Sequence, residues 1–177
     1  MSDCVTHAQH LPAKDGRYAP FPDRVHPKLA AALKGEGIDQ LYTHQTAAIQ
    51  SACAGDHTVL VTPTASGKSL CFHLPVLSDL MDNPEGRALM LYPTKALTQD
   101  QYTGLHGLIE RTGADIRTFT FDGDTPPDAR RAVRDQGQIV LTNPDMLHAG
   151  ILPHHPKWLK LFRNLRYVVL DELHAYK

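Results

Sequence analysis

The sequence predicts an α/β fold with a mostly parallel β-sheet that is covered by helices on both faces. Five short apolar runs have the length of strands: TVLVT (58–62), ALMLY (88–92), RTFTF (117–121), IVLT (139–142) and YVVLD (167–171). Such runs are typical of strands buried on both faces. Helical patterns separate them, as in GKSLCFHL, KALTQDQYTGLHGLIERTG, PPDARRAVRDQ and PDMLHAG. Strands joined by helical crossovers run parallel, so we expect one such sheet.

Two further helices are expected before the first strand. HPKLAAALKGEGI predicts a short helix that Gly35 and Gly37 end. LYTHQTAAIQSACAG predicts a second, with Thr43 as its cap and Gly55 as its stop.

The first 25 residues differ from the rest of the chain. They are polar and contain Pro12, Pro20 and Pro22. We therefore expect residues 1–25 to form a flexible arm and residues 26–177 to form the packed domain.

Composition limits the classes of protein that the chain can represent. With 42% apolar and 21% charged residues, it is typical of a globular protein. No run of about 18 apolar residues predicts a membrane span, and no secretory signal is evident at the N-terminus, so a cytoplasmic location is the expectation. Because the net charge is −1, any nucleic acid must be held by a local arrangement of donors.

The three cysteines are scattered, which favours reduced thiols over a disulfide framework. We expect Cys53 and Cys71 to be small core residues. Cys4, His7 and His10 are spaced three apart and could bind a metal from one face of a helix. This end of the chain looks frayed, however, and a metal site needs packed surroundings, so no metal is expected there.

The segment TPTASGKS (62–69) matches the phosphate-binding pattern G-x-x-x-x-G-K-[S/T] except that Thr62 replaces the first glycine. In that pattern, backbone N–H groups and a helix N-terminus face the phosphates, the lysine reaches the β and γ phosphates, and the hydroxyl holds Mg²⁺. Threonine can take the first position if the backbone there needs no positive φ. The alternative is an ordinary helix start, but a strand before and a helix after favour a phosphate loop. Its expected residues are Thr64, Ala65, Ser66, Gly67, Lys68 and Ser69.

Two adjacent carboxylates, Asp171 and Glu172, follow the last predicted strand. Hydrolysis of a nucleoside triphosphate needs one carboxylate to hold Mg²⁺ through its water shell and another to orient and deprotonate the attacking water. Solvated turn residues are the alternative. The apolar run before the pair and its distance from Lys68 favour the catalytic interpretation.

These two segments together indicate a family. Asp171-Glu172-Leu173-His174 resembles the DExH box of superfamily 2 helicases, and TPTASGKS resembles their motif I, in which threonine is common at the first position. The resemblance implies a RecA-like P-loop NTPase fold that uses ATP and Mg²⁺. It implies that Ser69 and Asp171 hold the metal, Asp171 through water. The catalytic residues would be Lys68, Asp171, Glu172 and His174.

LYTHQTAAI resembles the Q-motif segment, which implies that Gln45 binds the adenine edge through its amide. A surface glutamine on a helix is the alternative. The aromatic residue that stacks on adenine is left open among Tyr18, Phe21 and Tyr42.

LMLYPTKALTQDQ resembles motif Ia, in which Pro93, Thr94 and Lys95 would hold a phosphodiester backbone. Thr94 is also a plausible helix cap. FDGDT and LTNPDML resemble two further strand-holding segments, with Gly123 allowing close approach and Thr142 offering its hydroxyl. Contacts to phosphate and sugar hold a strand without recognising its sequence.

In combination these segments most resemble the YprA/MrfA-type subgroup of DExH helicases. That resemblance implies ATP-driven movement along DNA, 3′ to 5′, in DNA repair, with RNA left open as a substrate because backbone contacts distinguish the two weakly. A kinase-like enzyme acting on a small molecule and a binding-only fragment are the alternatives. We expect the chain to be truncated just after the DExH box, so that the second RecA-like domain needed for catalysis lies outside it.

Overall fold

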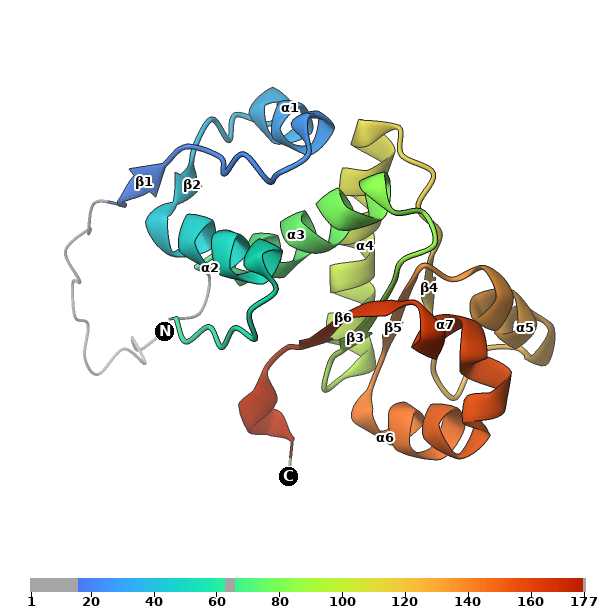
Figure 1. Cartoon of the computed structure of the whole chain (residues 1–177). Coiled ribbons are helices and arrows are strands. Elements are labelled where there is room, and N and C mark those ends of the chain that lie inside the picture. The colour runs from blue at the N-terminus through green and yellow to red at the C-terminus, as the bar shows by residue number, and fades with distance from the viewer. Residues whose placement is uncertain (1–15, 63–65, 177) are drawn as a thin grey trace, which may run out of the picture.

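The computed structural model describes residues 16–62 and 66–176, and Figure 1 shows their arrangement. Its main sheet has four strands in the order β4-β5-β3-β6, and every neighbouring pair is parallel. The strands are β3 (Arg87–Leu91), β4 (Thr118–Thr120), β5 (Ile139–Thr142) and β6 (Leu165–Leu170). The predicted α/β class with a parallel sheet is therefore confirmed.

The helices match the predicted alternation closely. Those of the first half are α1 (Pro27–Gly35), α2 (Thr43–Ala54), α3 (Lys68–Asp82) and α4 (Lys95–Thr112). The second half contains α5 (Pro127–Gln136), α6 (Pro144–Met146), η1 (Leu147–Ile151), η2 (Leu152–Trp158), α7 (Leu159–Arg163) and η3 (Leu173–Ala175). Gly55 ends α2 with φ 91°, as expected, whereas the N-cap of α2 is Tyr42 and not Thr43.

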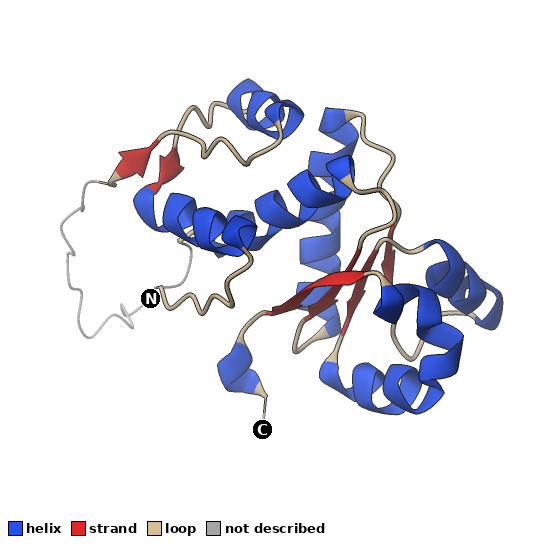
Figure 2. Ribbon diagram, in the orientation of Figure 1, coloured by secondary structure: helices blue, strands red, loops and turns tan. Residues whose placement is uncertain are grey.

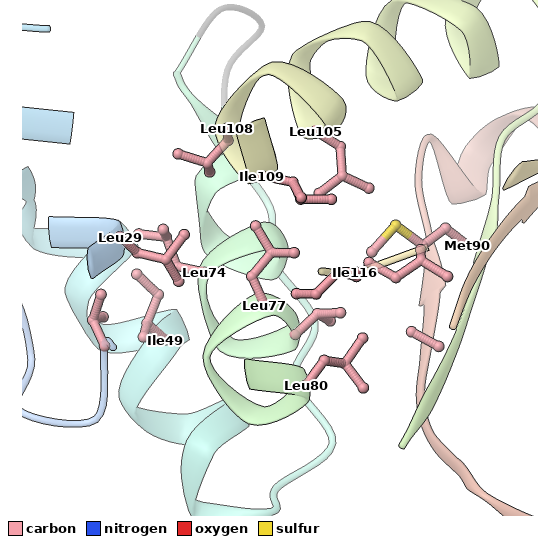
Figure 3. Packing of buried hydrophobic residues seen from close by; sticks show 14 of the residues in the cluster. Leu29, Ile49, Leu74, Leu77, Leu80, Met90, Leu105, Leu108, Ile109 and Ile116 are labelled. Carbon is pink, nitrogen blue, oxygen red and sulfur yellow. The ribbon is translucent and has the colours of Figure 1, made fainter. Parts of the chain in front are cut away.

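Two groups of helices cover the two faces of the sheet (Figure 2). Ala88 and Met90 of β3 join a core built by α1, α2, α3 and α4, whereas Leu89 between them joins a second core with Trp158 and Leu161. Side chains alternate between the faces of a strand, so a fully apolar strand can supply both cores. Figure 3 shows Leu74 and Leu77 of α3 within the larger core.

Packed structure begins before residue 26, where we expected the domain to start. The short strand β1 (Tyr18–Ala19) pairs antiparallel with β2 (Leu41–Tyr42), and Val25 is buried in the larger core. Proline and polar content suggested a flexible arm, but apolar contacts and backbone pairing hold this stretch against α2. Residues 1–15, with Cys4, His7 and His10, lie outside the described residues.

One predicted strand is absent from the described structure. Residues 58–62 form no strand, and the side chains of Val59 and Val61 are 82% and 90% exposed. A strand needs a neighbour for its backbone hydrogen bonds, and these residues pair with neither edge strand of the sheet, β4 or β6. Val168 and Leu170 of β6 are about half exposed as well. An apolar run of strand length was therefore insufficient evidence for a strand here.

The cysteines meet the expectation in part. Cys71 is buried in α3, and burial raises the pKa of its thiol to about 11. Cys53 is only half-buried, and it packs against the larger core. Among the described helices, none combines the length and apolar character that crossing a membrane requires.

Candidate functional site

The described part of the phosphate loop ends at a left-handed glycine. Gly67 has φ 73° and is the N-cap of α3, so Lys68 and Ser69 open that helix. A Cβ atom added to Gly67 would lie 2.5 Å from Nε2 of Gln45. Both the backbone conformation and the close contact therefore require glycine at this position. Thr64 and Ala65 lie outside the described residues.

Thr62 bonds across the loop. Its hydroxyl lies 2.6 Å from the hydroxyl of Ser66, and either group can donate. The residue that replaces the usual glycine therefore brings the two described ends of the loop together.

Gln45 supports the loop from the start of α2. Its side chain is 3% exposed; the carbonyl accepts from the N–H of Tyr42 at 2.9 Å, and the amide donates to the carbonyl of Gly67 at 2.9 Å. Both ends of the amide are thus used within the protein. This placement does not display Gln45 to a base, and its predicted contact with adenine stays a prediction.

His44 contacts the phosphate loop, which the sequence did not predict. Its Nε2 lies 3.0 Å from the carbonyl oxygen of Ser66. The imidazole stacks on Tyr42 at 5.6 Å between centroids, and Tyr42 stacks on Tyr18 at 5.0 Å. The only signal in the sequence was the position of His44 next to Gln45.

The same aromatic stack narrows the choice of adenine partner. Tyr18 and Tyr42 are exposed and lie on the side of α2 that contacts the loop, whereas Phe21 packs against the core beneath Lys34. Aromatic faces open to solvent are suited to stacking on a base. Because the rings of Tyr18 and His44 already stack on Tyr42, the placement favours Tyr18 over Tyr42 and Phe21.

The acidic pair lies at the carboxyl end of β6. The backbone N–H of Asp171 donates to the carbonyl of Leu91 at 3.0 Å, and that of Glu172 donates to Oδ1 of Asp171 at 2.9 Å. Glu172 has φ 50°, the one positive φ among the described non-glycine residues. Nδ1 of His174 lies 3.4 Å from Oε2 of Glu172. A left-handed backbone at a non-glycine residue is a feature often found at functional sites.

Electrostatics connect this pair with the phosphate loop. Burial raises the pKa of Asp171, an effect that the N–H of Glu172 and the ammonium of Lys68 oppose. Tyr176 closes the same end of the sheet by donating to the carbonyl of Leu91 at 2.9 Å. Its burial and the two neighbouring carboxylates raise the pKa of Tyr176 to about 12. The ammonium of Lys68 thus acts on the carboxylate of Asp171, although burial has the larger effect on its pKa.

The oxygen ligands expected for Mg²⁺ come from two elements. Ser69 lies in the first turn of α3, and Asp171 follows β6. A hydroxyl and a carboxylate are hard oxygen donors of the kind that Mg²⁺ prefers, with water completing the coordination. Within residues 16–62 and 66–176, no cluster of three His, Cys, Asp or Glu side chains could bind a metal alone. The donor set thus fits a magnesium ion that is also held by phosphate.

The segments expected to hold a nucleic acid lie at the same edge of the sheet. Thr94 caps α4 by accepting from the N–H of Leu97 at 3.2 Å, so the capping role foreseen for it is confirmed. Lys95 is exposed and forms an ion pair with Asp124. Gly123 lies in the turn after β4, where its carbonyl accepts from Arg130 at 3.2 Å. Pro93 is half-buried just before Thr94.

Thr142 is placed differently from expectation. It is 1% exposed, and its hydroxyl donates to the carbonyl of Phe121 at 2.6 Å. Thr142 ends β5, an interior strand, so its side chain is enclosed between its neighbours. A buried hydroxyl that already donates within the protein is not presented to a phosphate, and this expected role is corrected.

Comparison with known proteins identifies relatives. The family model described as DEAD/DEAH box helicase matches residues 42–177. The helicase YprA of Bacillus subtilis is 50% identical over 173 residues, which are 98% of this chain and 23% of YprA. The helicase hrq1 of Schizosaccharomyces pombe is 39% identical over 97% of this chain and 17% of its own length. Both relatives carry the name ATP-dependent helicase.

Solved structures agree with these relatives. The DUF1998 helicase MrfA, in a crystal structure bound to DNA and AMPPNP, superposes with a TM-score of 0.89 at 52% identity, over 93% of this chain and 23% of MrfA. The RNA helicase Prp28 of Chaetomium thermophilum bound to ADP gives a TM-score of 0.71 at 24% identity, over 88% of this chain and 39% of that structure, a likeness of fold alone. The chain spans less than a quarter of the length of YprA and of hrq1.

Proposed function

The chain belongs to the DEAD/DEAH box helicase family, and we propose on this basis that it is the ATP-binding domain of a motor that moves along nucleic acid. The observations that carry the proposal are geometric: the left-handed Gly67 opens α3 with Lys68 in its first turn, and the acidic pair follows β6 at the carboxyl edge of the sheet. Ligands of open α/β sheets bind at this edge. A phosphate loop that approaches the acidic pair there would hold a nucleoside triphosphate with its metal.

The residues take separate roles in this proposal. Gly67 and Lys68 bind the phosphate chain at the N-terminus of α3, where backbone N–H groups and the helix dipole favour anions. Ser69, and Asp171 through water, would hold Mg²⁺, which would neutralise charge on the phosphates. Glu172 accepts the proton of the attacking water, and His174, beside it, orients its carboxylate.

Nucleic acid is proposed to bind along Thr94, Lys95 and the turn that contains Gly123. Thr94 and Lys95 are exposed and lie one strand away from the acidic pair, because β3 pairs directly with β6. Their hydroxyl and ammonium groups suit phosphates and not bases, so the contact is independent of sequence. The DNA bound to MrfA supports DNA as the polymer. A role in DNA repair and a cytoplasmic location are part of the proposal and rest on the sequence.

A second candidate is that this chain binds nucleotide without turning it over. The observation that favours it is that residues 58–62 before the loop are not part of the sheet, with Val59 and Val61 exposed. The catalytic edge would then be complete only in a longer protein. Both candidates predict that the chain binds ATP. Measurement of ATP hydrolysis distinguishes the motor domain from the domain that only binds nucleotide.

Thermal unfolding with and without Mg²⁺ and ATP tests the nucleotide site. A ligand at about 100 times its Kd stabilises the folded state by about 2.7 kcal/mol, which corresponds to a rise in Tm of roughly 5–10 °C for a chain of this size. Lys68→Ala should abolish the rise. Lys157→Ala, which removes an exposed lysine from η2, should keep it. Equal responses of wild type and Lys68→Ala to ATP would contradict the proposal.

A further inference from the structure

Two neighbouring side chains of α2 bind two neighbouring carbonyl groups of the phosphate loop. Nε2 of His44 lies 3.0 Å from the oxygen of Ser66, and Nε2 of Gln45 lies 2.9 Å from the oxygen of Gly67. A carbonyl oxygen can only accept, so His44 must carry a hydrogen on Nε2. Both contacts therefore run in the same direction, from donors on α2 to acceptors on the loop.

These contacts fix the direction of the peptide groups. In a trans peptide the carbonyl of one residue and the N–H of the next point in opposite directions within one plane, and the described chain has no cis peptide. Holding the carbonyl of Ser66 toward α2 turns the N–H of Gly67 away from α2. Holding the carbonyl of Gly67 does the same for the N–H of Lys68. The first N–H groups of a helix are the ones that bind anions.

The imidazole of His44 is itself held in place. Its ring lies nearly parallel to Tyr42, at an interplanar angle of 13°, and Tyr42 stacks in turn on Tyr18. On the loop side, Gly67 approaches α2 so closely that a Cβ there would overlap the amide of Gln45. A ring fixed on one face and a loop pressed against its donors leave little freedom for the peptide to flip.

We propose that His44 is a positioning residue for phosphate binding, which acts by orienting the N–H of Gly67 through the carbonyl of Ser66. The inference rests on the proposed nucleotide site and adds a residue that none of the motifs singles out. Its energetic basis is a peptide that is already oriented before the ligand arrives, so that binding does not have to order it. The imidazole itself does not touch the nucleotide.

Two substitutions separate the hydrogen bond from the packing of the ring. His44→Phe keeps an aromatic ring against Tyr42 but has no donor. His44→Gln loses the ring but keeps an N–H donor at a similar reach from the backbone. We would measure the Kd of AMPPNP with Mg²⁺ by calorimetry for the 177-residue chain and both variants, with Lys68→Ala as the control for specific binding.

The expected result is a Kd about tenfold weaker for His44→Phe, the scale of one net hydrogen bond, and within about threefold of wild type for His44→Gln. Equal affinities of the two variants, or a greater loss in His44→Gln, would overturn the inference, because the ring and not the donor would then matter. If the wild-type chain binds AMPPNP and Lys68→Ala does not, either result concerns His44 alone. Absence of binding in wild type would overturn the proposed nucleotide site and this inference together.

Discussion

Lys95 and Asp124 form an ion pair that joins the segment after β3 to the segment after β4. The pair is open to solvent, with side chains 55% and 82% exposed. The hydrogen bond between them raises the pKa of Lys95 and lowers the pKa of Asp124. The ammonium of Lys95, which we propose as a phosphate ligand, is thus already paired with the carboxylate of Asp124 in the same chain. A phosphodiester has to compete with that carboxylate.

Asp124→Asn should therefore strengthen nucleic-acid binding, by a few-fold because exposed ion pairs are weak. Lys95→Ala should weaken binding about equally for unrelated sequences and lower the dependence of log K on log salt by roughly one unit. Anisotropy of labelled single strands at two salt concentrations measures both. Asp135→Asn is the matched control, since Asp135 pairs with Arg131 within α5. A loss of affinity in Asp124→Asn would show that the carboxylate positions Lys95 and does not compete for it.

Gly67→Ala should destabilise the chain and remove nucleotide binding. A left-handed alanine costs about 1–2 kcal/mol, and its Cβ would also lie 2.5 Å from the amide of Gln45. Gly104→Ala is the opposite case, because Gly104 lies inside α4 with no atom near its missing Cβ. That change should stabilise by about 0.5–1 kcal/mol. Denaturant unfolding of both variants checks the two signs, and a neutral Gly67→Ala would contradict the described loop conformation.

Asp171→Asn should raise the Tm of the nucleotide-free chain at neutral pH by about 1–3 °C. Burial raises the pKa of Asp171 in the folded state above its ordinary value of 3.8, so ionisation costs more in the folded than in the unfolded chain. The contribution of neutral Asp171 to folding stability is fully present below the pKa of Asp171 in the unfolded chain. It is lost as the pH rises through the higher pKa of Asp171 in the folded chain. The difference between variant and wild type should shrink as the pH falls below about 4, where both side chains are neutral. A lower Tm for Asp171→Asn at pH 7 would refute this sign.

His73 should make the chain less stable in mild acid. Its imidazole is buried in α3 with no described hydrogen-bond partner for Nε2, and burial lowers its pKa from 6.5 to about 4. The unfolded chain takes up a proton near pH 6.5 while the folded chain does not, so stability falls as the pH drops from about 6.5 towards 4. His73→Leu should reduce that fall by several degrees of Tm. His154→Gln, at an exposed position of η2, should leave it unchanged.

The sequence predicted the elements whose partners lie within this chain. The runs that became β3, β4, β5 and β6 differ from their predicted bounds by no more than two residues at either end, because each is apolar and has a neighbouring strand. The run Thr58–Thr62 has the same character and forms no strand, since pairing depends on a neighbour and not on the run itself. Periodicity contains no information about which neighbour is present.

The candidate site was foreseeable where residue type determines the chemistry. A glycine, a lysine and a hydroxyl at a helix start have few other uses together with two carboxylates at a strand end, and the structure places the first three at the start of α3 and the carboxylates after β6. Thr142 shows the limit, because only the packing of β5 decides that its hydroxyl faces inward. The contact of His44 with Ser66 depends on the approach of α2 to the loop, a tertiary relation without a local signal.

Because the outer side of β6 is open, association of this chain with other copies of itself should depend on protein concentration. Backbone donors and acceptors along that side are unpaired within the described structure, and Val168 and Leu170 beside them are half exposed. Open strand edges can pair with the edges of other molecules, so a high protein concentration favours association of the chain and dilution reverses it. The nucleotide affinity and any ATPase rate measured per molecule would then change with protein concentration. Variants should therefore be compared at the same concentration.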